Sequence, residues 1–172
     1  MPIVDFLLPE FDQEMSKTRQ MLERIPTDKL DFKPHEKSWR MAELASHIAN
    51  MVGWTTETMK NTSFDVQPPG APPYKPPVAA TSEELLAMFD ESAKGAREAL
   101  AGATDAALMQ PWSLLMGGKP IFTMPRIACI RGFVMNHAIH HRGQLSVYLR
   151  LAGIPVPGMY GPSGDDPNTF GG

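Results

Sequence analysis

The residues of most chemical interest lie in the segment 134–144, Val-Met-Asn-His-Ala-Ile-His-His-Arg-Gly-Gln, which holds three of the five histidines. On a helix with 100° per residue, His141 lies about 40° from His137, and both fall within an apolar stripe that includes Ile130 and Leu145. Buried imidazoles need partners for their ring nitrogens, and two of them one turn apart satisfy each other only in part. A single metal ion would satisfy both, because imidazoles at i and i+4 on one helix face converge on one cation.

This spacing is a weak signal by itself. With 5 histidines in 172 residues, chance places roughly 0.14 such pairs in a chain. We therefore weigh a metal site evenly against histidines that serve only the core or the surface. His140 lies about 60° from His137 on the other side, so we expect it at the edge of the stripe rather than among the ligands.

A third histidine, His47, belongs to another predicted helix and shares a face with Met51 and Trp54. A lone histidine on an apolar face is more often a core residue, but His35 lies in a loop, which leaves His47 as the remaining inward candidate. Glu43 precedes His47 by one turn and either orients its ring as an acceptor or is a solvated residue at a helix start. Acidic residues are otherwise scarce on the predicted inward faces, which argues against a dinuclear carboxylate site.

Four more residues of the last helix carry polar or reactive groups, and we expect two of them to lie near the histidines. Gln144 and Tyr148 follow His141 by one and two turns on the inward side. They either donate hydrogen bonds to a metal-bound ligand or an oxyanion, or simply line a cavity and fill the core. We expect Arg142 to point away from the metal, as a surface or dimer residue, and Cys129 to be a packing residue rather than a nucleophile.

Four segments with helical periodicity must position these side chains. The first spans about residues 4–25, the second about residues 40–61, the third begins at Thr81, and the fourth runs from Pro125 to about Ala152. The stripe of the first helix comprises Phe11, Met15, Thr18, Leu22 and Ile25. Asp12, Glu14, Lys17 and Arg19 lie off this stripe.

Cap signals bound three of these helices. Ser38 is a plausible N-cap for the second helix, and Thr81 with Glu84 forms a capping box for the third. Gly153, followed by Pro155, ends the fourth helix. Four amphipathic helices with one stripe each predict an all-α fold, a four-helix bundle with long inter-helix loops.

The segments between the helices are rich in proline and glycine. Residues 65–80 form a Pro-rich loop, with prolines crowded between 68 and 77. Near residues 112–123, Gly117-Gly118 signals a hairpin that Pro120 weakens, so we expect an extended excursion and, at most, a short extended hairpin. The tail, residues 153–172, is predicted to be irregular.

Composition places outer bounds on the function. With 172 residues and 42% apolar content, we expect a single domain over residues 1–172 with a substantial core. A net charge of -3 argues against a nucleic-acid partner. No apolar stretch of about 18 residues is present and no basic leader precedes Asp5, so we expect no membrane partner and a cytoplasmic location. The single cysteine excludes an intrachain disulfide and any multi-thiolate metal site.

Several motifs together resemble one family. They are Trp39…Glu43-Leu44-Ala45-x-His47 and His137-x-x-His140-His141-Arg142-Gly143-Gln144…Tyr148-Leu149-Arg150…Gly153. The lead-in Leu22-Glu23-Arg24-Ile25-Pro26 and the closing Val156-Pro157-Gly158-Met159-Tyr160-Gly161 are similar too. This pattern resembles the DinB superfamily of four-helix-bundle proteins over most of the chain, with the Pro-rich loop the least familiar part.

The resemblance implies a divalent metal ion held by three histidines, which map onto His47, His137 and His141. The ion would be zinc, nickel, iron or manganese, and we expect zinc or nickel to be found. The resemblance also implies a homodimer, and the apolar residues around much of the fourth helix agree with this. Characterised members include metal-dependent thiol transferases and a thiol-dependent isomerase, but a shared fold does not choose the reaction.

Three neutral imidazoles would leave a divalent ion with at least one open position, which is typical of catalytic rather than structural sites. Such a site activates either a bound water or a bound thiol. Our first hypothesis is a metal-dependent enzyme acting on a small molecule, either a thiol S-transferase that uses a low-molecular-weight thiol or a hydrolase. The alternatives are a non-catalytic, dimeric metal- or ligand-binding stress protein and a dimerisation module with vestigial histidines.

Overall fold

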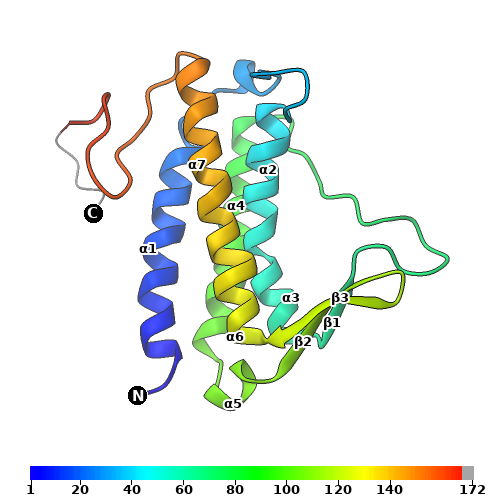
Figure 1. Ribbon diagram of the computed structural model, residues 1–172. Coiled ribbons are helices and arrows are strands. Elements are labelled where there is room, and N and C mark those ends of the chain that lie inside the picture. The colour runs from blue at the N-terminus through cyan, green and yellow to red at the C-terminus, as the bar shows by residue number, and fades with distance from the viewer. Residues whose placement is uncertain (168–172) are drawn as a thin grey trace.

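The computed structural model describes residues 1–167, which are mostly helical with a small three-stranded sheet (Figure 1). The helical elements are α1 Val4–Leu22, the 3-10 turn η1 Thr27–Lys29, α2 Met41–Val52, α3 Trp54–Lys60, α4 Ser82–Ala101, α5 Asp105–Leu108, α6 Arg126–Ala128, the π-helical turn η2 Cys129–Met135 and α7 Asn136–Leu151. The strands are β1 Ser63–Asp65, β2 Pro111–Met116 and β3 Lys119–Pro125. None of the helices in this part of the chain is long and apolar enough to cross a membrane.

Four long helices, α1, α2, α4 and α7, lie side by side, and the sheet extends from one end of them (Figure 1). Helix α4 packs against α1 and α2, and α7 also packs against α1 and α2. The predicted stripe of the first helix is buried, and Phe11 and Leu22 are among its least exposed side chains. The largest fully buried side chains from the other helices are Met41, Leu44, Ile48, Met51, Leu85, Phe89, Leu100 and Leu108.

Two residues of α1 depart from the expectation. Glu14 and Lys17 were expected off the apolar stripe, but both are buried. The reason is that α1 has two covered sides, one facing α4 and the other facing α7 and the chain that follows it. Helix α1 also ends at Leu22, short of the predicted residue 25.

The second predicted helix is two helices, α2 and α3, that meet at Gly53. A Cβ at this position would lie 3.2 Å from the Asn50 carbonyl oxygen and 3.4 Å from Ser92 Oγ, so the glycine permits a close approach to α4. Ser38 is not the N-cap. The helix begins after Arg40, whose main-chain N–H donates to Glu43 Oε2 at 2.8 Å.

The sheet has the order β1–β2–β3, with β1 parallel to β2 and β2 antiparallel to β3. The expected extended excursion is therefore a regular hairpin, and the mostly helical fold also contains a small three-stranded sheet, in which β1 was not expected. Gly117 and Gly118 turn the hairpin with φ values of 62° and 76°, and their N–H groups donate to the Asp65 carboxylate at 3.2 and 2.7 Å. Pro120 lies opposite Leu115 on the edge strand β3, beside a register shift, and edge strands and bulges are the places where a sheet tolerates proline.

The fourth predicted helix is realised as α6, η2 and α7 in continuous succession, and Thr81 caps α4 through the Glu84 N–H as predicted. Gly153 ends α7 with a φ of 74°. The π-helical turn η2 changes the angular spacing of residues, so the 100° wheel does not hold before residue 136. Residues 154–167 contain no helix or strand, as expected for the tail, and the remainder of that prediction lies outside the described residues.

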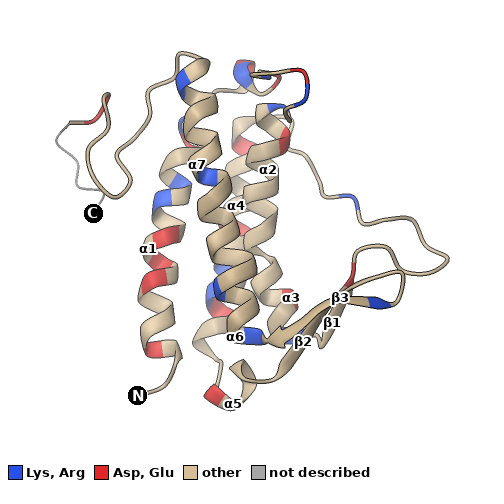
Figure 2. Cartoon of the chain, in the orientation of Figure 1, with Lys and Arg blue, Asp and Glu red and all other residues tan. Residues whose placement is uncertain are grey.

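Charged residues of both signs are interspersed on the helices, and α1 carries both (Figure 2). The strands are almost free of charge, with Asp65 and Lys119 at their ends. The sheet therefore presents a mostly uncharged surface to α3.

Candidate metal centre

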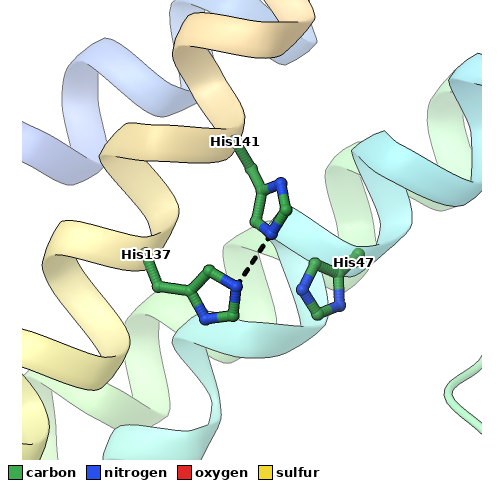
Figure 3. Close-up of side chains that lie close together, drawn as sticks. All are labelled: His47, His137 and His141. Carbon is green, nitrogen blue, oxygen red and sulfur yellow. Dashed lines mark hydrogen bonds between the residues drawn. The ribbon is translucent and has the colours of Figure 1, made fainter. Parts of the chain in front are cut away.

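The structure brings together the three histidines that the sequence singled out. Helix α2 supplies His47 and helix α7 supplies His137 and His141, and their rings converge in the space between the two helices (Figure 3). One ring nitrogen from each residue lies within 4.8 Å of the others, and His137 Nε2 lies 2.8 Å from His141 Nε2. All three side chains are half-buried.

These positions fit a metal ion. At a metal–nitrogen distance of about 2.0–2.1 Å and tetrahedral angles, two ligand nitrogens lie about 3.3 Å apart. The observed separations, from 2.8 Å to 4.8 Å at most, bracket this value, so small ring rotations suffice. His137 Nδ1 is buried and has no well-formed hydrogen bond among the described residues, which is a further sign that this ring's partners are incomplete.

The electrostatics of the cluster keep the rings neutral. Burial, followed by the proximity of His141 and His137, lowers the pKa of His47 to about 4. The pKa values of His137 and His141 are also lowered, first by burial, although the hydrogen bond that His141 donates to Gln144 acts in the opposite sense on His141. Neutral imidazoles carry the free lone pair that binds a metal ion, so the folded protein presents ligands that need little further deprotonation at neutral pH.

Gln144 orients one of the three histidines. His141 Nδ1 lies 2.7 Å from Gln144 Oε1, which can only accept, so His141 carries its proton on Nδ1 and leaves the Nε2 lone pair free. In the metal-free arrangement, His137 Nε2–H then donates to that lone pair. Such an acceptor on the distal ring nitrogen is the usual device for fixing a ligand histidine.

The other two candidates are engaged elsewhere. Glu43 binds the Arg40 main chain and guanidinium, and the main-chain hydrogen bond is the largest cause of its lowered pKa. Its role is to cap α2, and it is not a hydrogen-bond partner of His47 among the described contacts. The Tyr148 hydroxyl donates to the Trp39 carbonyl oxygen at 3.1 Å, which fastens the loop before α2 onto α7.

Two tryptophans flank the histidine cluster. Trp39 stacks on His141, with ring centroids 6.0 Å apart and planes at 23°, and also contacts His47 edge-on. On the other side, Trp54 contacts His47 edge-on at 6.0 Å. Trp54 could be located from the sequence because it follows His47 by two helical turns. Trp39 could not, because it lies in a loop, where helical periodicity gives no direction.

A hollow lies on each side of the cluster. The more polar one, of about 560 Å³, is lined by Trp39, Gln144, Tyr148 and the ring of His141 itself. The other, of about 360 Å³, is predominantly apolar and includes Trp54 in its wall. His140 is exposed and its ring contacts that of His141, but it is not part of the convergent cluster, in line with its expected place at the edge of the stripe.

Comparison with known proteins places this architecture. The sequence model of the DinB family matches residues 4–169. The chain belongs to the DinB family. It is 26% identical over 168 residues to the uncharacterized protein YrdA of Bacillus subtilis strain 168, a match that covers 98% of this chain and 94% of YrdA.

Two solved DinB-like proteins share the fold. The crystal structure of one from Bacillus cereus ATCC 10987 superposes with a TM-score of 0.72 at 24% identity, covering 92% of this chain and 98% of that one. The crystal structure of YjoA from Bacillus subtilis gives a TM-score of 0.64 at 20% identity, covering 87% and 94% of the respective chains. At these identities the likeness concerns the fold alone.

In this DinB-family chain, Arg142 is not a surface residue. It points away from the histidines, as the wheel predicts, but that side of α7 faces α1 and the guanidinium is buried. It donates to Glu14 Oε2 at 2.6 Å, to Thr18 Oγ1 at 3.0 Å and to the Tyr160 hydroxyl at 2.5 Å. The wheel gave the correct angle, but it could not show that a second helix and the tail cover this side.

Cys129 in this DinB-family chain is the packing residue that was expected. Its Sγ is buried 3.8 Å from Thr58 Oγ1, and burial raises the pKa of the thiol. A thiol held in its protonated form is a poor nucleophile and a poor metal ligand.

Proposed function

We propose that His47, His137 and His141 hold one divalent metal ion and that the protein is a metal-dependent enzyme acting on a small molecule. One observation carries the proposal: three ring nitrogens lie within 4.8 Å of one another in a half-buried position with a hollow on each side. Buried clusters of neutral histidines without a carboxylate are expensive unless a ligand satisfies them. Open sites with three protein ligands are typically catalytic.

When bound, a divalent ion supplies an open coordination position that lowers the pKa of a thiol or a water. Between these two substrates, the surroundings of the cluster favour the thiol. Hydrolysis benefits from a general base near the attacking water, yet the Glu43 carboxylate is engaged with Arg40 and the Gln144 amide is not a base. Trp39 and Trp54 present aromatic surface beside the cluster, which suits an apolar electrophile.

The proposed reaction is thiol S-transfer. The sulfur of a low-molecular-weight thiol, deprotonated at the site, forms a bond to an electrophilic carbon, and the leaving group departs with its electron pair. The thiol proton passes to solvent. In this reaction Gln144 fixes His141, while Trp39 and Trp54 flank the reacting centre. Among the candidate ions, zinc and nickel suit a set of three imidazoles and also accept sulfur.

The test incubates metal-loaded protein with 1-chloro-2,4-dinitrobenzene, with and without a panel of small thiols, and follows thioether formation. We expect thiol-dependent consumption that is lost in His141→Ala and retained in His140→Ala, a matched substitution one residue away. Thiol-independent cleavage of esters or amides would support a hydrolase instead. If metal-replete protein turns over none of a broad panel, the enzymatic proposal fails and a non-catalytic metal-binding protein takes its place.

A further inference from the structure

The apolar hollow of about 360 Å³ is enclosed by elements from distant parts of the sequence. Residues of helix α3, the turn η2 and strands β1 and β2 line it. Tyr74, from the Pro-rich loop, also lines it. It accepts a hydrogen bond from Asn50 Nδ2 at 2.7 Å, and its ring packs edge-on against Phe64 at 5.5 Å. The Pro-rich loop is therefore part of a built pocket, with a volume near the lower end of the ~300–1,000 Å³ typical of small-molecule sites.

The chemistry of the lining is specific. Trp54 and Phe133 stack with centroids 5.5 Å apart, and they present aromatic surface to the pocket. Trp112 also lines the pocket and is only 4% exposed, yet its Nε1–H has no hydrogen-bond partner among the described residues. This nitrogen has almost no accessible surface, so the indole presents its apolar ring to the pocket rather than its N–H.

The rim adds a charge preference. Glu57 lines the pocket, and its carboxylate is exposed and accepts from Asn61 Nδ2. The adjoining strands are almost uncharged (Figure 2). A carboxylate at the rim repels an anionic ligand. This repulsion adds to the cost of removing the ligand's charge from water when it enters an apolar pocket.

We propose that this pocket binds an uncharged aromatic molecule, which packs against Trp54 and Phe133. The pocket shares a wall with the histidine cluster, because Trp54 contacts His47 and also lines the pocket. It is therefore the binding place of the electrophilic substrate, a role that rests on the proposed function, whereas the binding itself does not.

The test uses metal-free protein and 4-nitrobenzyl alcohol, a neutral aromatic probe, and compares it with 4-nitrobenzoate. Binding is measured by calorimetry and by the three tryptophan indole N–H signals in NMR spectra. We expect saturable shifts of Trp54 and Trp112 with little change in Trp39, which does not line this pocket. The anion should bind at least tenfold more weakly.

Two substitutions on neighbouring residues of β2 locate the probe. Leu114 lines the pocket and Leu115 does not, although both are half-buried. Leu114→Trp should fill the pocket and abolish probe binding, whereas Leu115→Trp should retain it. Trp112→Phe keeps an aromatic ring in the lining and removes only an N–H that the ligand does not reach, so affinity should change less than about threefold. Circular dichroism establishes that each variant is folded.

The outcomes separate this inference from the metal site. His47→Ala should bind the probe like the wild type, since His47 does not line the pocket. Absence of probe binding, or equal binding by Leu114→Trp and the wild type, overturns the inference even if zinc binds at the histidines. Probe binding without zinc binding would instead overturn the proposed function and leave the pocket in place.

Discussion

Replacing Arg142 with methionine should destabilise the fold more than the loss of any exposed ion pair. The guanidinium is 3% exposed and makes four hydrogen bonds, to the Glu14 carboxylate and carbonyl oxygen, to Thr18 and to Tyr160. Without it, the one hydrogen bond that the buried Glu14 carboxylate retains within residues 1–167 is that from the Tyr160 hydroxyl at 2.7 Å. The variant therefore leaves an uncompensated charge between α1 and α7.

The magnitude follows from that uncompensated charge. Removing one partner of a buried ion pair typically costs about 3–5 kcal/mol. For a chain of this size, each kcal/mol lowers the melting temperature by about 2–4 °C, so the expected decrease is about 6–20 °C. Glu14→Met together with Arg142→Met removes both charges, and the double variant should be less destabilised than the sum of the two single variants.

Urea unfolding followed by circular dichroism measures these differences. Arg97→Met is the control, because it breaks the Arg97–Asp12 contact between α4 and α1 at 2.8 Å, but both side chains are largely exposed. Exposed pairs contribute little, so this variant should unfold close to the wild type. If Arg142→Met unfolds at the same urea concentration as Arg97→Met, or if the two buried substitutions are additive, the reasoning is refuted.

Three further predictions concern the histidine cluster. With a pKa of about 4 in the folded metal-free protein, against about 6.5 unfolded, His47 is protonated first in the unfolded chain. The free energy of unfolding should therefore fall as pH decreases from 6.5 to 4, and urea titrations of His47→Gln should show a shallower fall. Chelation should leave the helical circular dichroism signal intact, because the apolar core forms without the histidines, and it should lower the melting temperature. Metal at a thousandfold excess over Kd should raise the free energy of unfolding by about 4 kcal/mol. Gln144→Ala should weaken zinc affinity about tenfold or more by calorimetry, because His141 loses the acceptor on Nδ1; unchanged affinity would show that Gln144 does not orient this ligand.

Much of the helical framework could be predicted because apolar periodicity records which side of a helix is covered. That argument correctly brought His47 toward His137 and His141, although ninety residues separate the first from the second. It failed where a helix has two covered sides, as with Glu14 and Arg142, because a polar side chain on a buried side interrupts the apolar pattern that signals burial.

The sheet shows a different limit. Gly117-Gly118 marked the hairpin turn, but β1 pairs with β2 across about fifty residues, and a three-residue strand carries too little periodicity to be found. The π-helical turn is equally invisible, because its apolar residues fit an ordinary helix. Both features line the apolar pocket, so the pocket could not be predicted from the sequence.

The central claim is that three histidines from two helices bind one divalent ion. Elemental analysis of untagged protein, loaded with zinc and dialysed, tests it most directly in the wild type, His47→Ala, His141→Ala and His140→Ala. The account predicts one zinc ion per chain in the wild type and His140→Ala, and none in His47→Ala and His141→Ala. No bound metal in the wild type, or loss of zinc in His140→Ala with retention in His141→Ala, would contradict it.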